Sequence, residues 1–178
     1  MQKDLEKELV EATVGGDLES FGELCRRYYT AMVAVAYAVL SDHQLAEDAA
    51  QESFARALVR VRSLRDKAKF APWLAAICRN VAKDMAAAKA RHIHLVDLSQ
   101  AGHNNSDGES SRLIRRAIER LPARAKELIV LRYYNNLSYE QMASILGISP
   151  AAINGRLARA RRKMEGYLRR NGFPENRL

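Results

Sequence analysis

Apolar side chains recur every three or four residues along most of the chain, which is the spacing of amphipathic α-helices. No segment alternates apolar and polar residues in the way that a half-buried strand does. The pattern predicts long helices over about 17–39, 44–62 and 72–88, and a second group of helices between 113 and 170. A further helix is predicted to begin near Leu5. We therefore expect an all-α protein.

The helical pattern is interrupted between residues 94 and 111. The segment QAGHNNSDGESS within this stretch is polar, contains glycine and serine, and has no apolar period, which is typical of a flexible linker. The three long helices that precede it have short connections, as in a compact bundle. We predict two small helical domains, a helical bundle at 1–93 and a second domain at 112–178, joined by the linker 94–111.

The segment from Leu137 to Lys163 has the features of a helix-turn-helix. Ser138 can cap a first helix, and Gln141, three residues later, completes a capping box. Gly147 provides the left-handed residue that ends this helix. Ser149 can cap a second helix, which has a proline at its first position, where a missing N–H costs nothing. Such a second helix fits the major groove of DNA, with its N-terminal turns at the base edges.

The charge of this second helix favours DNA binding. Between residues 150 and 170 there are seven arginines and lysines and a single acid, whereas solvated helices usually alternate the two signs. The whole chain has a net charge of +8, which favours a polyanionic partner. A pair of surface helices or an anionic membrane surface are the alternatives. The cations lie beside a groove-reading motif, and the predicted exposed side carries Asn154, Arg156, Arg159 and Arg162.

Other chemistry has little support. Cys25 and Cys78 lack metal-ligand spacing and are expected to be reduced packing residues. His92 and His94 have no cysteine nearby, so we predict neither a metal site nor a cofactor. The chain lacks a Gly-rich phosphate loop and a nucleophile elbow, so we expect no enzyme. Its polar start is unlike a signal peptide, and Ala31–Leu40 is about half the length of a bilayer span. We expect a cytoplasmic protein without membrane insertion.

Two groups of residues in the N-terminal bundle have alternative interpretations. Asp48, Gln51 and Glu52 lie at i, i+3 and i+4 on the polar face of the second helix. From spacing alone a solvated face is favoured over a docking surface for a basic helix. Around Phe70 and Trp73, basic residues mix with aromatic ones, an arrangement that can hold single-stranded nucleic acid. For Trp73 a core position is favoured. The basic and polar residues of this group are Lys67, Lys69, Arg79, Asn80, Lys83, Lys89 and Arg91.

Together the two groups of helices resemble a bacterial RNA polymerase sigma factor of the extracytoplasmic-function (ECF) subfamily of the sigma-70 family. The sequences AEDAAQESF and WLAAICRNVA are specific signals when they precede a helix-turn-helix. The order and spacing of all the matching segments carry the resemblance. These segments are 17–29, 46–58, 70–84, 121–149 and 153–164.

The resemblance implies a subunit that binds RNA polymerase core, directs it to specific promoters and promotes strand opening. In the family, the first domain grips a coiled coil of the polymerase clamp and captures the opened minus-10 element. The second domain, beside the flap, reads the minus-35 element as duplex. Asp48, Gln51 and Glu52 would then contact the polymerase, and Asn80 matches a position that can line the pocket for an extruded base. The implied minus-10 residues are Lys69, Phe70, Trp73, Arg79, Asn80 and Lys83.

At the minus-35 element the resemblance gives the leading roles to Arg156 and Arg159. Each could contact a guanine or a phosphate, and the sequence leaves both roles open. The family usually has a cation and a small residue just before Arg156, where this chain has Asn154 and Gly155. Asn154 could read an adenine edge, and Gly155 costs the helix about 1 kcal/mol relative to alanine. The implied minus-35 residues are Ser149, Ala151, Ala152, Asn154, Gly155, Arg156, Arg159 and Arg162.

The resemblance also implies regulation by a protein partner. Family members commonly are held inactive by an anti-sigma factor that covers both domains, and we expect no sensory domain after the recognition helix. The alternative function is an autonomous helix-turn-helix repressor or activator whose N-terminal bundle dimerises or binds a signal. Symmetry separates the two, because a dimeric regulator reads paired half-sites, whereas a sigma factor reads two different elements.

Overall fold

A computed structural model of the chain describes residues 2–93 and 109–173. Within these ranges all regular elements are helical and no strand is present, which confirms the predicted all-α class. The first group of helices comprises α1 (Gln2–Val14), α2 (Leu18–Leu40), α3 (His43–Arg60) and α4 (Phe70–Ile93), with short 3₁₀ turns at Val61–Ser63 and Lys67–Lys69 between α3 and α4. The second group comprises α5 (Glu109–Glu119), α6 (Ala123–Ile129), a π-helical turn (Val130–Tyr134), α7 (Tyr139–Leu146) and α8 (Pro150–Arg170).

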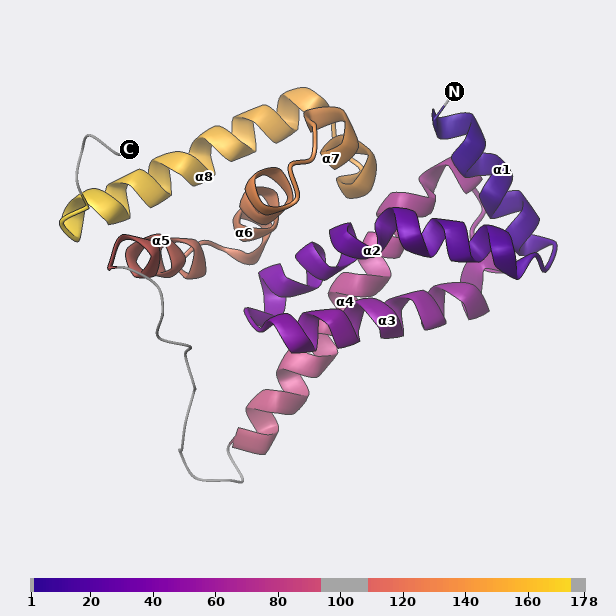
Figure 1. Ribbon diagram of the computed structural model, residues 1–178, viewed down its shortest axis with the longest axis horizontal. Helices are drawn as coiled ribbons and strands as arrows, with labels where there is room; N and C mark the ends of the chain where they lie inside the picture. The colour runs from indigo at the N-terminus through magenta and orange to yellow at the C-terminus, as the bar shows by residue number, and fades with distance from the viewer. Residues whose placement is uncertain (1, 94–108, 174–178) are drawn as a thin grey trace.

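The first group is a bundle in which α2, α3 and α4 pack on one another (Figure 1). Phe70, at the start of α4, has no exposed surface, and its ring lies 6.0 Å from the ring of Tyr28 on α2. Helix α1 is joined to this bundle by the buried Val10 and by Glu6, whose carboxylate accepts a hydrogen bond of 2.5 Å from the Tyr28 hydroxyl. Asp17 caps α2 as predicted, by accepting from the Glu19 amide.

The second group folds around the helix-turn-helix. The predicted break near Pro122 is confirmed, because α5 ends at Glu119 and α6 begins at Ala123. The predicted linker 94–111 is wrong at its C-terminal end, since α5 already begins at Glu109. An acidic residue in the first turn of a helix is favoured by the helix dipole, and this signal outweighs the Gly- and Ser-rich composition just before it. The rest of that linker, 94–108, lies outside the described residues.

The two groups of helices also pack against each other, a contact that the sequence analysis did not predict. Helix α6 lies on α2 and helix α7 lies on α4, so that α6 and α7 form a layer between α8 and the first bundle (Figure 1). One continuous cluster of buried apolar side chains runs through both groups, from Val10 of α1 to Ala160 of α8. Among the helices that the structure describes, none is long and apolar enough to cross a membrane.

Burial of the Cys78 thiol in α4 predicts a measurable dependence of stability on pH. The thiol donates to the carbonyl oxygen of Met32 at 3.3 Å, and burial raises the pKa of Cys78 from 9.0 to about 11. A raised pKa in the folded protein contributes stability that is complete below the pKa of the unfolded chain and is lost as the pH rises through the folded value. Between about pH 9 and pH 11 we therefore expect the stability advantage of the wild type over Cys78→Ala to fall.

Urea unfolding at several pH values measures this difference. We expect a loss on the order of 2 kcal/mol across the interval. The alanine variant is the matched control, because the cavity that it creates costs the same free energy at every pH. A difference between the two proteins that stays constant from pH 8 to pH 11 would contradict the assignment.

Candidate nucleic-acid interface

Side-chain caps fix the two helices of the helix-turn-helix. The Ser138 hydroxyl accepts from the Gln141 amide at 3.2 Å, and the Gln141 side-chain oxygen accepts from the Ser138 amide at 2.7 Å. Gly147 has the left-handed φ of 66° that was predicted from its position. The Ser149 hydroxyl accepts from the Ala152 amide at 3.2 Å and caps α8. The predicted capping box, turn and second cap are therefore all confirmed.

Helix α8 has one buried and one exposed side. Ile153, Leu157 and Ala160 have at most 1% of their surface exposed. None of the eight predicted minus-35 residues is buried, and all lie on α8 or at its cap. A Cβ atom added at Gly155 would meet only the tip of the Arg159 side chain, at 3.9 Å. Packing within the protein therefore does not require glycine at position 155.

The exposed cations of α8 are not neutralised within the protein. Arg156, Arg159, Arg161, Arg162 and Lys163 are exposed, and none of the five forms an ion pair in the part of the chain that the structure describes. Cations that have no acidic partner can bind phosphates without first losing an intramolecular contact. The first turns of α8 therefore combine accessible side chains for base edges with a surface that attracts the DNA backbone.

The predicted docking residues lie together on α3. Asp48 and Gln51 are exposed, and the partly exposed Glu52 accepts a hydrogen bond of 2.7 Å from the Arg56 side chain. The same face ends in Val59, which is 83% exposed. Val59 was not among the residues predicted from the sequence, although an apolar residue on the polar face of an amphipathic helix can indicate a contact surface. The face thus offers negative charge, an amide and one apolar contact.

The residues predicted around the start of α4 do not form one surface. Lys69, Asn80 and Lys83 are exposed, whereas Trp73 is half-buried, with its ring 5.9 Å from that of Phe70. Phe70 itself is fully buried, so the structure places it in the core and not on a surface against which a base could stack. The preference for a core position at Trp73 agrees with its packing against the apolar cluster.

Arg79, the sixth residue of this set, reaches across to the second group of helices. The Arg79 Nε donates to the Oε1 atom of Glu127 on α6 at 3.0 Å, and the Arg79 Nη2 lies 2.9 Å from the same oxygen. The Arg79 side chain is 12% exposed and that of Glu127 is 4% exposed. Glu127 was not among the predicted residues, because nothing in local spacing indicates a partner so distant along the chain.

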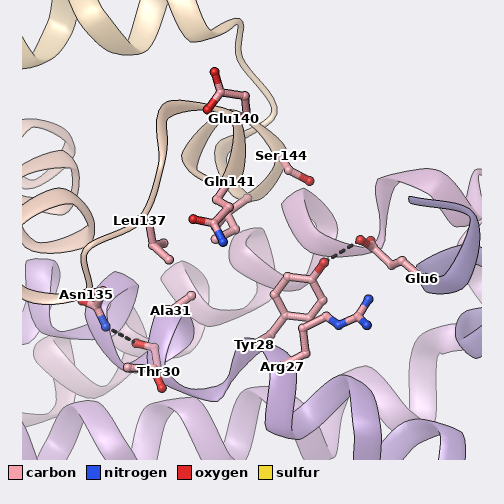
Figure 2. Close-up of a pocket in the computed structure, with 11 residues that line it drawn as sticks. Glu6, Arg27, Tyr28, Thr30, Ala31, Asn135, Leu137, Glu140, Gln141 and Ser144 are labelled. Carbon is pink, nitrogen blue, oxygen red and sulfur yellow. Dashed lines mark hydrogen bonds between the residues drawn. The ribbon is translucent and has the colours of Figure 1, made fainter. Parts of the chain in front are cut away.

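A cleft of about 420 Å³ lies between the two groups (Figure 2). Residues of α1 and α2 form one wall, and α7 with the segment that joins it to the π-helical turn forms the other. The Asn135 side chain donates to the carbonyl oxygen of Thr30 at 3.2 Å across the cleft. The remaining lining residues are Glu6, Arg27, Tyr28, Ala31, Leu137, Glu140, Gln141, Ser144 and Ile145. His94, one of the two histidines considered for a metal site, lies outside the described residues, and so does the His92 side chain.

Comparison with known families identifies both groups of helices. Residues 24–92 match Sigma-70 region 2, and residues 111–164 match Sigma-70, region 4. The chain belongs to the sigma-70 family. All the predicted polymerase-binding and minus-10 residues of this sigma factor fall within the first match, and all the minus-35 residues fall within the second. The family consists of transcription initiation factors, not of enzymes.

Relatives of this sigma factor indicate its subgroup. It is 34% identical to a probable RNA polymerase sigma factor, RfaY, of Xanthomonas campestris, over 92% of this chain but only 44% of that protein. It is 28% identical to the ECF RNA polymerase sigma-E factor of Haemophilus influenzae, over 90% of this chain and 93% of that protein. The chain therefore spans less than half of the first relative and nearly all of the second. It is an ECF-type sigma factor.

A solved structure shares the fold. The sigma factor RpoE of Bartonella quintana, in complex with the anti-sigma factor NepR, superposes with a TM-score of 0.55 at 25% identity. The match covers 85% of this chain and 98% of that one. The relative was thus solved with a protein partner bound.

Proposed function

We propose that this chain binds RNA polymerase core in the cytoplasm, directs it to specific promoters and promotes opening of the DNA strands. The observation that supports the proposal is that the two matched regions present surfaces of opposite charge. The first region presents an acidic face on α3, and the second presents exposed cations along α8. Two unlike surfaces fit two unlike targets. Nothing supports the alternative of an autonomous repressor or activator.

Reconstituted transcription tests the proposal directly. The purified chain is added to core polymerase with fragmented genomic DNA, and the start sites of the transcripts are mapped. We expect start sites preceded by two conserved elements that core enzyme alone does not use. Failure to initiate from any template, with a chain that is folded by circular dichroism, would contradict the proposed function.

The docking face on α3 would contact the polymerase clamp. Asp48 and Glu52 supply negative charge and Gln51 an amide for a basic coiled coil, and Val59 adds an apolar contact at the end of the face. Glu52 is oriented by Arg56, whose guanidinium lies 3.8 Å from Asp84 on α4. Charge complementarity of this kind sets the rate and specificity of association more than it sets raw affinity.

Charge reversal on α3 is expected to weaken the complex with core polymerase. In Asp48→Lys with Glu52→Lys, two attractive contacts become repulsive, so we expect at least a tenfold loss of affinity, because like charges brought together at an interface cost several kcal/mol. Pull-down with immobilised core enzyme measures the effect. Glu8→Lys with Glu11→Lys, on the exposed side of α1, makes the same change in net charge. Equal binding by both double variants would exclude this docking face.

The exposed residues of α4 would hold the opened minus-10 strand. Extruding a base costs a few kcal/mol of unstacking, so a pocket that receives the base lowers the free energy of the open complex. Asn80, Lys69 and Lys83 are accessible for this contact. Lysines follow the phosphates, and the Asn80 amide offers both a donor and an acceptor to a base edge.

Asn80→Ala is expected to damage strand opening more than closed-complex formation. The amide would contact only the extruded base, so permanganate reactivity should fall several-fold while filter binding of the closed complex stays near the wild-type value. Gln44→Ala, which removes an exposed amide at the start of α3, serves as the control. Equal losses at the two stages would contradict the role of Asn80.

Arg156 and Arg159 would read the minus-35 element. A bidentate contact between an arginine and a guanine contributes roughly 1–3 kcal/mol of discrimination. Asn154 lies beside them, exposed, and offers an amide that pairs with adenine. Gly155 leaves space for the sugar-phosphate backbone to approach α8 closely.

Alanine at Arg156 or at Arg159 is expected to reduce minus-35 selectivity roughly tenfold, with polymerase binding intact. Footprints of the polymerase complex on promoters with altered minus-35 sequences measure the change. A lost base contact relaxes specificity at one position, whereas a lost phosphate contact weakens all sequences alike and lowers the salt slope by about 1. Arg170→Ala, at the far end of α8, removes the same charge. Unchanged footprints in both variants would refute the assignment.

The relative solved with NepR supports an anti-sigma partner for this chain. A protein that contacts both walls of the cleft between the two groups would cover surfaces of region 2 and region 4 together. Such a partner would keep the chain from the polymerase until it is released.

A further inference from the structure

The contact between the two groups of helices includes one ion pair that is almost fully withdrawn from water. Arg79 belongs to α4 and is one of the residues predicted from the sequence to contact the minus-10 strand, and Glu127 belongs to α6 in the second group. Two further polar contacts join the groups. The Lys126 ammonium donates to the Ser41 hydroxyl at 2.8 Å, and Asn135 donates to the Thr30 carbonyl oxygen.

The pairing of Arg79 is incomplete. Both of its close approaches are to one oxygen of Glu127, and the Nη2 atom is buried without a hydrogen-bond partner among the described residues. The second carboxylate oxygen of Glu127 lies 3.4 Å from Arg124 instead. A phosphate offers several oxygens and would satisfy the whole guanidinium fork. Arg79 thus has a better partner available in DNA than the one that it has in the protein.

The turn of the helix-turn-helix lies against the start of α4. A Cβ atom added at Gly147 would come within 3.2 Å of the Pro72 Cβ, so the approach is close. Pro72 lies between Lys69 and Trp73, two of the residues predicted from the sequence to contact the minus-10 strand. The second group therefore covers part of the strand-binding surface, while the cations of α8 and the acidic face of α3 stay open.

In this closed arrangement the chain cannot bind both promoter elements. Elements centred near positions minus 10 and minus 35 are about 25 base pairs apart, which is roughly 85 Å of duplex at 3.4 Å per base pair. A compact chain of 178 residues is roughly 40 Å across. Engagement of both elements requires the two groups to separate, and separation breaks the Arg79–Glu127 pair.

We propose that the free chain inhibits itself by closing its second group of helices on α4, with Glu127 competing against DNA phosphate for Arg79. Polymerase and the opened strand then hold the groups apart. The inference rests on the proposed function for its biological meaning, but closure is a property of the isolated chain and can be measured without polymerase.

The test uses Glu127→Gln, which keeps the size of the side chain and removes its charge. Small-angle scattering of the full chain is expected to show a larger radius of gyration than the wild type. Affinity for a fluorescein-labelled oligothymidylate of twelve nucleotides is expected to rise at least fivefold at low salt. Glu8→Gln on the exposed side of α1 makes the same change in net charge and should alter neither quantity.

Two further variants distinguish the loss of this ion pair from misfolding of the chain. The exchange Arg79→Glu with Glu127→Arg restores an ion pair and is expected to return the radius of gyration to the wild-type value. Asn135→Ala removes a contact at the edge of the interface and should expand the chain partially. A folded Glu127→Gln chain with the wild-type radius would overturn the proposal, and so would an expanded chain whose affinity for the oligonucleotide is unchanged. Failure of transcription by the wild type would count against the proposed function and leave these two results unaffected.

Discussion

The apolar character of α2 constrains the whole arrangement. From Ala31 to Leu40 all ten side chains are apolar or aromatic, and because a helix turns by about a quarter to a third of a circle per residue they point in every direction. Helices α1, α3 and α4 of the first group and α6 of the second group all pack against α2. The buried residues of this run are Ala31, Met32, Ala34, Val35, Ala36 and Ala38. The second group of helices therefore completes a core that the first group leaves partly open.

Because α6 and α7 pack on the first bundle, one of the two proposed nucleic-acid surfaces is exposed and the other is partly covered. The start of α8 lies on the far side of α6 and α7 from the first bundle (Figure 1). The cations of α8 are exposed. The start of α4 lies beneath α7, and Arg79 is paired with Glu127. A chain in this form can meet duplex DNA by charge alone, but it presents an incomplete surface to an opened strand. Such an order of events suits a factor that must find a promoter before it opens one.

Local signals in the sequence predicted the local structure well. The capping box of Ser138 and Gln141, the left-handed Gly147 and the cap at Ser149 each depend on residues within four positions, so their chemistry can be recognised without knowing the fold. The predicted boundary between the linker and α5 was wrong, because the composition of the first turn of α5 resembles that of a linker. The resemblance to ECF sigma factors, carried by segments along both groups, gave the family that the comparisons confirm.

Contacts between segments that are distant along the chain could not be predicted from local patterns in the sequence. Glu127 lies 48 positions from Arg79, and its burial depends on the docking of α6. The burial of Phe70 depends on α2 in the same way. The run Ala31–Leu40 was predicted to belong to one long helix and to be too short to cross a membrane, but its apolar residues on every side also indicate a helix that is covered on several sides. Apolar periodicity identifies one buried face of a helix and does not indicate which elements cover its other faces.

The incomplete pairing of Arg79 has a thermodynamic consequence that runs in both directions. Two equilibria that share one guanidinium are linked, so the factor by which Glu127 weakens the capture of a strand equals the factor by which a captured strand weakens the contact with Glu127. Melted DNA would therefore act as an effector of the chain's own shape. Once the strands anneal again, Arg79 is released from the DNA, and the same linkage favours renewed contact between the two groups of helices.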